Sequence, residues 1–169
     1  MNAQAFPELA LRPMLPQDAS VLAQIFRDSI AKLTGDDYDD AQQEAWIASA
    51  DDEEEFAARL AAELTLIATM AASPVGFLSL KGGEHIDMLY VHPSVARSGV
   101  ATFLVDAVEK IARSRGTDHL SVDASDTARA FFAKRGYSAL RRQTVPCGDE
   151  WLGNTHMQKR LEAEQGLPR

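Results

Sequence analysis

The segment from His85 to Gly116 constrains the fold of this 169-residue chain more than any other. It begins with a short apolar run, continues through a loop of small and basic residues, and ends in a helical pattern from about Val100 to Arg115. A strand, a tight loop and a helix start in this order leave backbone N–H groups without partners inside the helix. Such groups bind anions, phosphates in particular. We therefore predict a phosphate site in the loop before Val100.

The side chains of this loop suit a phosphate. Gly99 and Ala101 keep bulk away from it, and Arg97 adds a permanent positive charge. The loop from Ala96 to Ala101, which follows Val-His-Pro at a strand end, resembles the acyl-CoA-binding motif Gln/Arg-x-x-Gly-x-Gly/Ala of the GNAT superfamily of N-acetyltransferases. Ala96 stands where Gln or Arg is usual in that motif, and we expect Arg97 to compensate for it.

A second segment, which ends at Tyr137, resembles the pattern Asn-x-x-Ala-x-x-x-Tyr-x-x-x-Gly-Phe of the same superfamily. Ala128, Gly136 and Tyr137 fit this pattern, whereas Ser125 and Phe132 replace the usual Asn and Tyr. Two motifs in the right order and at the expected separation are more specific than either motif alone.

The periodicity of the remaining chain predicts the other elements. We expect strands over 9–14, 64–70, 75–80, 86–91, 119–123, 137–145 and 151–161, and helices over 19–32, 41–49, 100–115 and 127–135. A further helix is expected to start in the acidic run at 51–55 and to continue through Leu60. The three strands from 64 to 91 read as a meander, and the strand–helix–strand order around 100–115 predicts a parallel pair.

This order matches the GNAT topology, so the resemblance implies an α/β fold. Its central sheet is mixed and mostly antiparallel, with one splayed parallel strand pair and helices on both faces. We expect a single acyl-CoA N-acyltransferase domain over 1–169, with a core at about 9–161 and a loose tail at 163–169.

Composition narrows the class of protein. A net charge of −8 argues against nucleic acid as a partner. The single cysteine, Cys147, excludes an intramolecular disulfide and fits a reducing compartment. Zinc-type ligand spacing and a long apolar run are both absent, and no basic region precedes an apolar core at the N-terminus. We expect a cytoplasmic protein without metal or membrane partner, either a monomer or a homodimer.

The resemblance implies acetyl-CoA as the donor co-substrate and an amine as the acceptor. The pyrophosphate is then expected on the backbone of Arg97, Ser98, Gly99, Val100 and Ala101, with Thr102 nearby. The pantetheine arm is expected along Leu89, Tyr90 and Val91, opposite Asp123, Ala124 and Ser125. The side chains expected to cover the far end of the cofactor are Phe131, Phe132 and Arg135.

Attack on a thioester needs a neutral amine, and a lysine-like amine with a pKa of about 10.4 is mostly protonated at pH 7. A base is therefore useful. Asp87 is the first candidate because a carboxylate inside an apolar strand is costly unless it is paired or used. The alternative for Asp87 is a capping or salt-bridge role. His85 and Asp123 are the next candidates. Strict alternation would place Ile86, Met88 and Tyr90 on the face opposite His85, Asp87 and Leu89.

The resemblance also implies an oxyanion donor, which a backbone N–H near Tyr90 or Val91 can supply. Because Phe132 occupies the position of the usual acid tyrosine, Tyr137 or Tyr90 is the candidate acid, with core packing as the alternative. Cys147 is a minor candidate for an acyl-carrying nucleophile.

Acceptor selection is expected from Tyr38, Trp46 and the last strand pair around Trp151, Asn154 and His156, with core packing as the alternative for both tryptophans. The acidic loop at 36–40 hints at a cationic acceptor, although a solvated loop explains it equally well. A non-catalytic acyl-CoA-binding domain is the alternative function. A nucleotide-type phosphate enzyme is disfavoured because neither Gly-x-x-x-x-Gly-Lys nor Gly-x-Gly-x-x-Gly occurs.

Overall fold

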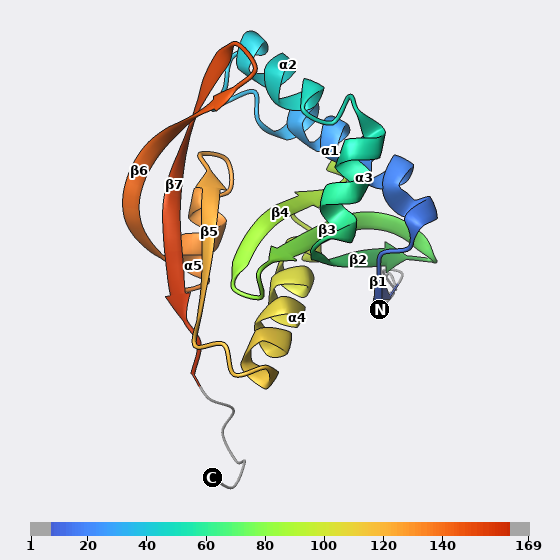
Figure 1. Cartoon of the computed structure of the whole chain (residues 1–169), viewed down its shortest axis with the longest axis vertical. Coiled ribbons are helices and arrows are strands. Elements are labelled where there is room, and N and C mark those ends of the chain that lie inside the picture. The colour runs from blue at the N-terminus through green and yellow to red at the C-terminus, as the bar shows by residue number, and fades with distance from the viewer. Residues whose placement is uncertain (1–7, 163–169) are drawn as a thin grey trace, which may run out of the picture.

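A seven-stranded sheet organises the protein in a computed structural model that describes residues 8–162 (Figure 1). Its order is β1-β2-β3-β4-β5-β7-β6. The strands are β1 (Leu9–Pro13), β2 (Leu64–Met70), β3 (Ser73–Lys81), β4 (His85–Val91), β5 (His119–Ser125), β6 (Ser138–Cys147) and β7 (Glu150–Arg160). The α-helices are α1 (Ala19–Leu33), α2 (Asp40–Ala48), α3 (Glu53–Ala61), α4 (Val100–Ser114) and α5 (Arg129–Lys134). The predicted α/β fold with a mixed sheet is confirmed.

The join between β4 and β5 is the feature of the sheet that matters most for a site. Within residues 8–162, all neighbouring strands are antiparallel except this pair, which is parallel as predicted. The pairing covers only His85 with Ser121 and Ile86 with Val122. Beyond Ile86 the two strands separate, so the edge of β4 that faces β5 loses its strand partner.

Two apolar clusters fill the two faces of the sheet. One packs α4 against β3 and β5 and includes Leu78, Leu104 and Leu120. The other packs α1 and α3 against β2 and β3 and includes Ile30 and Ile67. Figure 1 shows α1 to α3 grouped over the β1–β4 half, while only α2 reaches the hairpin end of β6 and β7. Among the described elements, no helix therefore covers the middle of β5, β7 and β6 on the side of α1.

A bulge in β4 changes which side chains face each cluster. Leu80 pairs with Ile86 and Ser79 with Met88, so Asp87 has no partner residue on β3. As a result, Ile86 belongs to the α4 cluster, whereas Met88 and Tyr90 pack in the α1 cluster. The predicted common face for these three residues was wrong because strict alternation does not anticipate an inserted residue.

The acidic run starts a helix, as predicted. The Asp52 carboxylate accepts a hydrogen bond from the N–H of Glu55 at 3.0 Å, and acidic residues occupy the first turn of α3. Helix α5 is shorter than the expected 127–135, and the predicted tail at 163–169 lies outside the described residues. No helix in the described chain is both long and apolar enough to cross a membrane.

Gly76 of β3 lets α4 lie close to the sheet. A Cβ atom at this position would stand 2.9 Å from Cγ1 of Val100 and 3.1 Å from the carbonyl oxygen of Tyr90. Since both distances are shorter than ordinary contacts, the absence of a side chain sets how near the start of α4 comes to β4. The open edge of β4 and the first turn of α4 thereby become neighbours.

Candidate functional site

The loop before α4 presents unpartnered backbone donors. Helix α4 begins after Gly99, whose φ is +93°, and no described side chain caps this end. Arg97 also has a left-handed φ of +63°, a conformation that costs a non-glycine residue roughly 1–2 kcal/mol. Such strain persists only where the surrounding structure enforces it. The geometry therefore fits the predicted phosphate cradle.

One pocket of about 600 Å³ joins this cradle to the gap between β4 and β5. Of the residues predicted to hold a cofactor, those that line it are Leu89, Tyr90, Val91, Arg97, Gly99, Val100, Ala101, Thr102, Asp123, Ala124, Ser125, Phe131 and Phe132. Ser98 and Arg135 do not. The backbone N–H of Ser98 already donates to the carbonyl of Val95 at 3.3 Å, and the guanidinium of Arg135 pairs with Asp106. Their predicted contacts with a cofactor therefore have no support from this geometry.

The end of the pocket near α1 has an aromatic wall that includes Trp46. Its Nε1 donates to the hydroxyl of Tyr90 at 3.2 Å, and burial raises the pKa of that phenol. Sequence reasoning missed Ser29 and Thr34, which also line this end. Their signal was available: both are small polar residues on or just after an otherwise apolar helix face.

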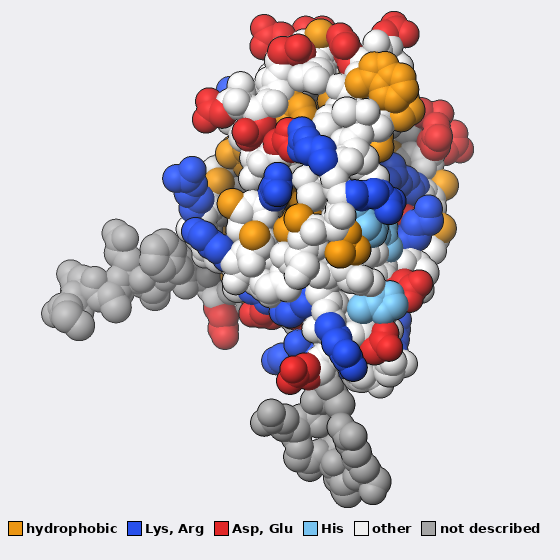
Figure 2. Space-filling model, turned by 90° about the vertical axis from the view of Figure 1, so that its left-hand side faces the viewer, with side chains coloured by type: hydrophobic (Ala, Val, Ile, Leu, Met, Phe, Trp, Pro, Cys, Tyr) orange, Lys and Arg blue, Asp and Glu red, His pale blue; other side chains and the backbone are white. Residues whose placement is uncertain are grey.

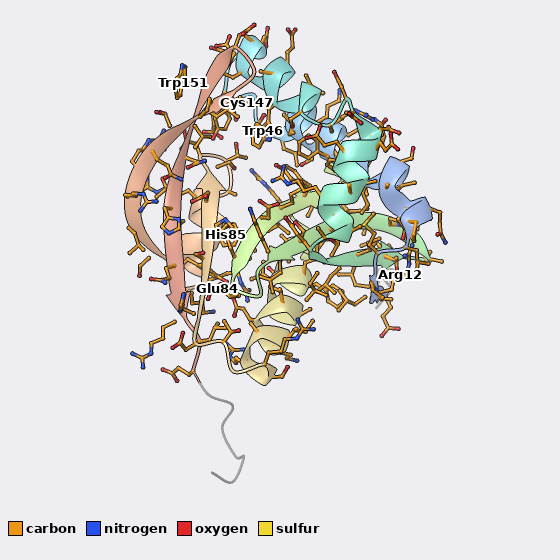
Figure 3. All side chains as sticks on the ribbon, viewed as in Figure 1. Arg12, Trp46, Glu84, His85, Cys147 and Trp151 are labelled. Carbon is orange, nitrogen blue, oxygen red and sulfur yellow. The ribbon has the colours of Figure 1, made fainter. Side chains whose placement is uncertain are left out.

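The other predicted acceptor residues are spread out. Tyr38 is buried, and its hydroxyl donates to the carbonyl of Gly153 at 2.6 Å, which ties the loop before α2 to β7. Trp151 is 62% exposed and projects outward at the β6–β7 hairpin (Figure 3). Asn154 lies on β7, and its Oδ1 is buried without a hydrogen-bond partner in the described structure. Among the predicted acceptor residues, Trp46 is therefore the one that lines the pocket, while Asn154 lies on β7 two residues before His156.

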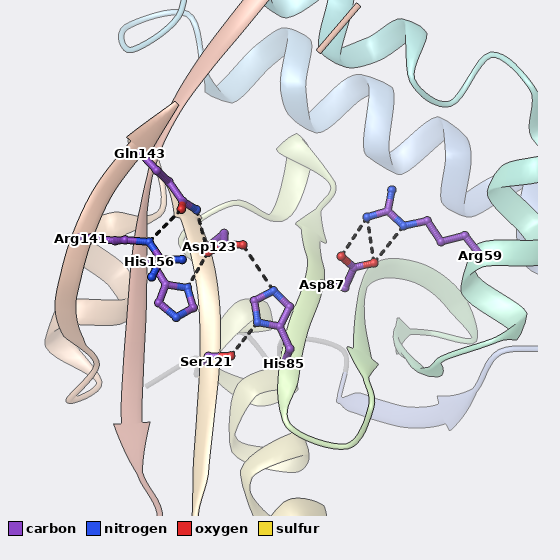
Figure 4. A network of polar contacts seen from close by, with 8 residues as sticks. All are labelled: Arg59, His85, Asp87, Ser121, Asp123, Arg141, Gln143 and His156. Carbon is purple, nitrogen blue, oxygen red and sulfur yellow. Dashed lines mark hydrogen bonds and ion pairs between the residues drawn. The ribbon is translucent and has the colours of Figure 1, made fainter. Parts of the chain in front are cut away.

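Asp87 lines the pocket but is held in an ion pair. Nε and Nη2 of Arg59 donate to its two carboxylate oxygens, each at 2.9 Å (Figure 4). Burial opposes ionisation of Asp87, but the hydrogen bonds from Arg59 outweigh it and keep its pKa below the usual value. The alternative salt-bridge role is therefore the one that the geometry favours, and a carboxylate with a lowered pKa is a weak base.

Glu63, which sequence reasoning did not single out, lies beside this pair. Burial, and then the nearby Asp87 carboxylate, raise the pKa of Glu63 to about 7. Its Oε2 has no hydrogen-bond partner in the described part of the chain. Glu63 therefore carries a proton in a large fraction of molecules at neutral pH.

This shift predicts a pH dependence of stability. Because the folded pKa of Glu63 lies above its ordinary value of 4.5, its stabilising effect is complete below about pH 4.5 and disappears as the pH rises through 7. Glu63→Gln should raise the free energy of unfolding at pH 8 by about 1–2 kcal/mol, after allowance for solvent screening. Urea unfolding at pH 5 and pH 8 measures this. An equal change at both pH values would contradict the prediction, and Glu54→Gln, on the exposed side of α3, is the control.

Asp123 is the centre of a polar cluster just beyond the last β4–β5 pair (Figure 4). Its Oδ1 lies 2.7 Å from Nδ1 of His156 and accepts a hydrogen bond from Gln143 at 3.0 Å. Its Oδ2 lies 3.6 Å from Nε2 of His85, and Nδ1 of His85 lies 2.7 Å from the hydroxyl of Ser121. The cluster thus connects β4, β5, β7 and β6 at the gap, with Asp123 itself in the pocket lining.

The other predicted catalytic side chains lie elsewhere. Tyr137 is buried, does not line the pocket, and donates its hydroxyl to Glu109 at 3.0 Å. Burial raises the pKa of the Cys147 thiol, and this residue lies near the hairpin end, away from His85 (Figure 3). Within the described residues, no group of three His, Cys, Asp or Glu side chains is arranged to hold a metal ion.

Comparisons with known proteins agree with the resemblance found in the sequence. Residues 34–161 match the family model of the acetyltransferase (GNAT) domain. The chain is 33% identical over 149 residues to the uncharacterized N-acetyltransferase YafP of Escherichia coli K12, which covers 88% of this chain and 94% of YafP.

Solved structures are also similar. A crystal structure of a GCN5-related N-acetyltransferase from Rhodopseudomonas palustris superposes with a TM-score of 0.90 at 57% identity, covering 95% of this chain and all of the other. PaiA N-acetyltransferase from Thermoplasma acidophilum, solved with coenzyme A, has a TM-score of 0.73 at 19% identity, covering 90% and 99%. The second likeness, at such low identity, concerns the fold alone.

Proposed function

The chain belongs to the GNAT family of acetyltransferases, and we propose that it transfers the acetyl group of acetyl-CoA to a primary amine of a small molecule or peptide. The observation that carries this proposal is a single pocket that joins an uncapped helix start to an interrupted strand pair. We further propose direct attack by the amine, and a cytoplasmic location that suits the single cysteine.

On the donor side, we assign the pyrophosphate to the backbone around Gly99 and to the charge of Arg97. The N–H groups of the first turn of α4 point along the helix axis toward this position. The free edge of β4 from Met88 to Val91 can pair with the amide groups of the pantetheine arm in the manner of an added strand. A backbone N–H of Tyr90 or Val91 then serves the developing oxyanion.

On the acceptor side, we assign proton removal to the cluster around Asp123 rather than to Asp87. Asp87 is neutralised by Arg59, whereas Asp123 faces the gap with His85 and His156 beside it. The amine forms its C–N bond as the C–S bond of the thioester breaks, and the cluster takes one amine proton. An imidazole paired with a carboxylate is well suited to hold that proton.

The leaving thiolate needs little help. A simple thiol has a pKa of about 8.5, so the thiolate departs near neutral pH without a strong acid. This makes the phenylalanine at position 132 compatible with catalysis. Neither Tyr137, which is bound to Glu109, nor Cys147 is given a role in the reaction.

Calorimetry with acetyl-CoA tests the donor site. Gly99→Val should weaken binding at least tenfold, because a β-branched residue is strained at φ +93° and adds bulk at the cradle. The control is Gly82→Val, which carries similar strain at φ +63° in the β3–β4 turn, away from the pocket. Equal losses in both variants, or no binding to the wild type at millimolar acetyl-CoA, would remove the basis of the proposal.

Phe132, which lines the pocket without a hydroxyl group, motivates a second candidate, a non-catalytic acyl-CoA-binding domain. Turnover with a panel of amines separates the two functions. Thiol release above the rate of acetyl-CoA hydrolysis supports the enzyme, and tight binding without turnover of any amine supports the binding domain.

A further inference from the structure

We propose that the amine acetylated by this protein also carries a carboxylate, and that Arg141 of β6 binds it. The proposal rests on the acetyltransferase function proposed above and specifies the substrate class of the same site. Its basis is the arrangement of side chains on the helix-free face of β5, β7 and β6.

Strand register places three functional side chains in one row. Asp123 pairs with His156, and His156 pairs with Arg141. Residues that pair directly across antiparallel strands project from the same face of the sheet. Arg141 therefore shares a face with the cluster proposed to deprotonate the amine. Its backbone lies two strands from Asp123, about 10 Å away at the usual strand spacing.

The charges on this face leave Arg141 without a counter-ion. The carboxylate of Asp87 is paired with Arg59, and that of Asp123 is in contact with His156. Nε of Arg141 donates to Oε1 of Gln143 at 3.3 Å, and within residues 8–162 its guanidinium is in no ion pair. An exposed guanidinium with free N–H groups binds a carboxylate through two parallel hydrogen bonds.

The wider distribution of charge agrees with an anionic group on the acceptor. In Figure 2, which views the side of the molecule that carries β6, Lys and Arg side chains lie across the middle, and Asp and Glu side chains lie near the top and again in the lower part. The acidic loop that hinted at a cationic acceptor has other roles: Asp39 caps α2, and Asp37 accepts a hydrogen bond from Thr127 at 2.8 Å. Neither of these carboxylates lines the pocket.

A second polar side chain on this face, that of Asn154, has an atom without a hydrogen-bond partner in the described structure. Asn154 pairs with Ser125 and Gln143, so it lies on the same face, one row from His156. Its Oδ1 is buried and has no hydrogen-bond partner in the described structure. A buried acceptor atom without a donor is costly.

These positions bound the size of the acceptor. The amine must reach the gap beside Asp123, while its carboxylate meets a side chain that extends from a strand about 10 Å away. Because the side chain of Arg141 spans part of this distance, amine and carboxylate can be only a few bonds apart. A free amino acid fits this description, and the aromatic wall of Trp46 and Tyr90 favours an apolar side chain.

Matched acceptors test the proposal. The panel comprises the common amino acids, their amides and, for phenylalanine and leucine, the amines without the carboxyl group. Turnover is followed by thiol release, and binding to the coenzyme A complex by calorimetry. We expect at least one free acid to have a kcat/KM about 10- to 100-fold above that of its amide, the range of a charged hydrogen-bond pair.

The matched variants are Arg141→Gln and Arg142→Gln. Arg142 is the next residue, projects from the opposite face and pairs with Asp126. Arg141→Gln should raise KM for the preferred acid about 10- to 100-fold and leave its amide within twofold, whereas Arg142→Gln should change neither. Arg141→Lys should restore part of the loss. Equal effects of Arg141→Gln on acid and amide would overturn the proposal, as would a preference for 2-aminoethyl phosphate over every free acid.

The calorimetric measurement distinguishes carboxylate recognition by Arg141 from the acetyltransferase function. A wild-type protein that binds free acids more tightly than their amides, and loses this difference in Arg141→Gln, supports carboxylate recognition even if no amine is acetylated. In that case only the acetyltransferase function fails. If amines are acetylated without any preference for a carboxylate, the enzyme stands and the inference about Arg141 is wrong.

Discussion

Asp123→Asn is expected to lower kcat/KM for the acetylated amine by about 10²- to 10⁴-fold, the usual contribution of a general base. The substitution preserves the shape of the side chain but removes the charge that contacts His156 and His85. The affinity for acetyl-CoA should stay within about threefold, because the pyrophosphate cradle lies at the start of α4. Steady-state kinetics and calorimetry on the same preparations measure the two effects.

The pH profile separates a chemical role from a structural one. An imidazole must be neutral to accept a proton, so kcat/KM of the wild type should rise with pH when the cluster removes the amine proton. His156 is faced by Asp123 from β5, His85 from β4 and Arg141 from β6. His156→Gln should abolish this rise, and Asp126→Asn, which concerns the pair with Arg142, should keep it.

Asp87→Asn provides the competing outcome. If this variant loses as much activity as Asp123→Asn and alone loses the pH dependence, Asp87 is the base despite its pairing with Arg59. If it keeps the wild-type profile, the assignment to the Asp123 cluster stands.

Glu109→Leu is expected to lower the free energy of unfolding by about 3–5 kcal/mol, the cost of removing one partner from a buried ion pair. The side chain of Glu109 is 3% exposed, and its oxygens lie 2.8 Å from Nζ of Lys159 and 3.6 Å from Nη2 of Arg113. The hydroxyl of Tyr137 donates to it at 3.0 Å. Without the carboxylate, several partly buried cations lose their counter-ion together. Urea denaturation at pH 7 measures the change.

An exposed carboxylate on the same half of the molecule serves as the comparison. Glu84 lies 3.8 Å from His119 in an exposed pair, so Glu84→Gln should cost no more than about 0.5 kcal/mol. A Glu109→Leu variant that loses less than 1 kcal/mol would show that apolar packing replaces the ion network. Adding Lys159→Met should recover part of the loss if repulsion among unpaired cations causes it.

The sequence predicted most of the elements because their signals are local. Three of these signals act within a few residues: the apolar stripe through α4, Gly99 just before α4, and the acids that start α3. The bulge at Asp87 could not be predicted, because it depends on how β4 pairs with β3. The length of α5 was overestimated. The residues from Thr127 form a turn before the helix, and their composition is equally compatible with a helix.

The same distinction applies to the candidate site. The cradle around Gly99 follows from a contiguous motif, and nearly all predicted residues there line the pocket. The cluster around Asp123 draws side chains from four strands, so it appears only once the register of β5, β7 and β6 is known. The contact between Arg59 and Asp87 joins residues 28 positions apart and reverses the priority of the base candidates. The contact of Tyr137 with Glu109, which the sequence does not reveal, favours the packing alternative for this residue.

The short pairing between β4 and β5 has a thermodynamic consequence. Within residues 8–162, the two halves of the sheet share two residue pairs at this join, and the remaining edge of β4 lacks a hydrogen-bonded neighbour strand. A coenzyme that occupies this edge binds the folded state alone, so by mass action it adds about 2.7 kcal/mol at a hundredfold excess over its Kd. Under the proposed function, the amount of intact protein in a cell follows the supply of acetyl-CoA, and scarcity of that metabolite exposes the chain to proteolysis.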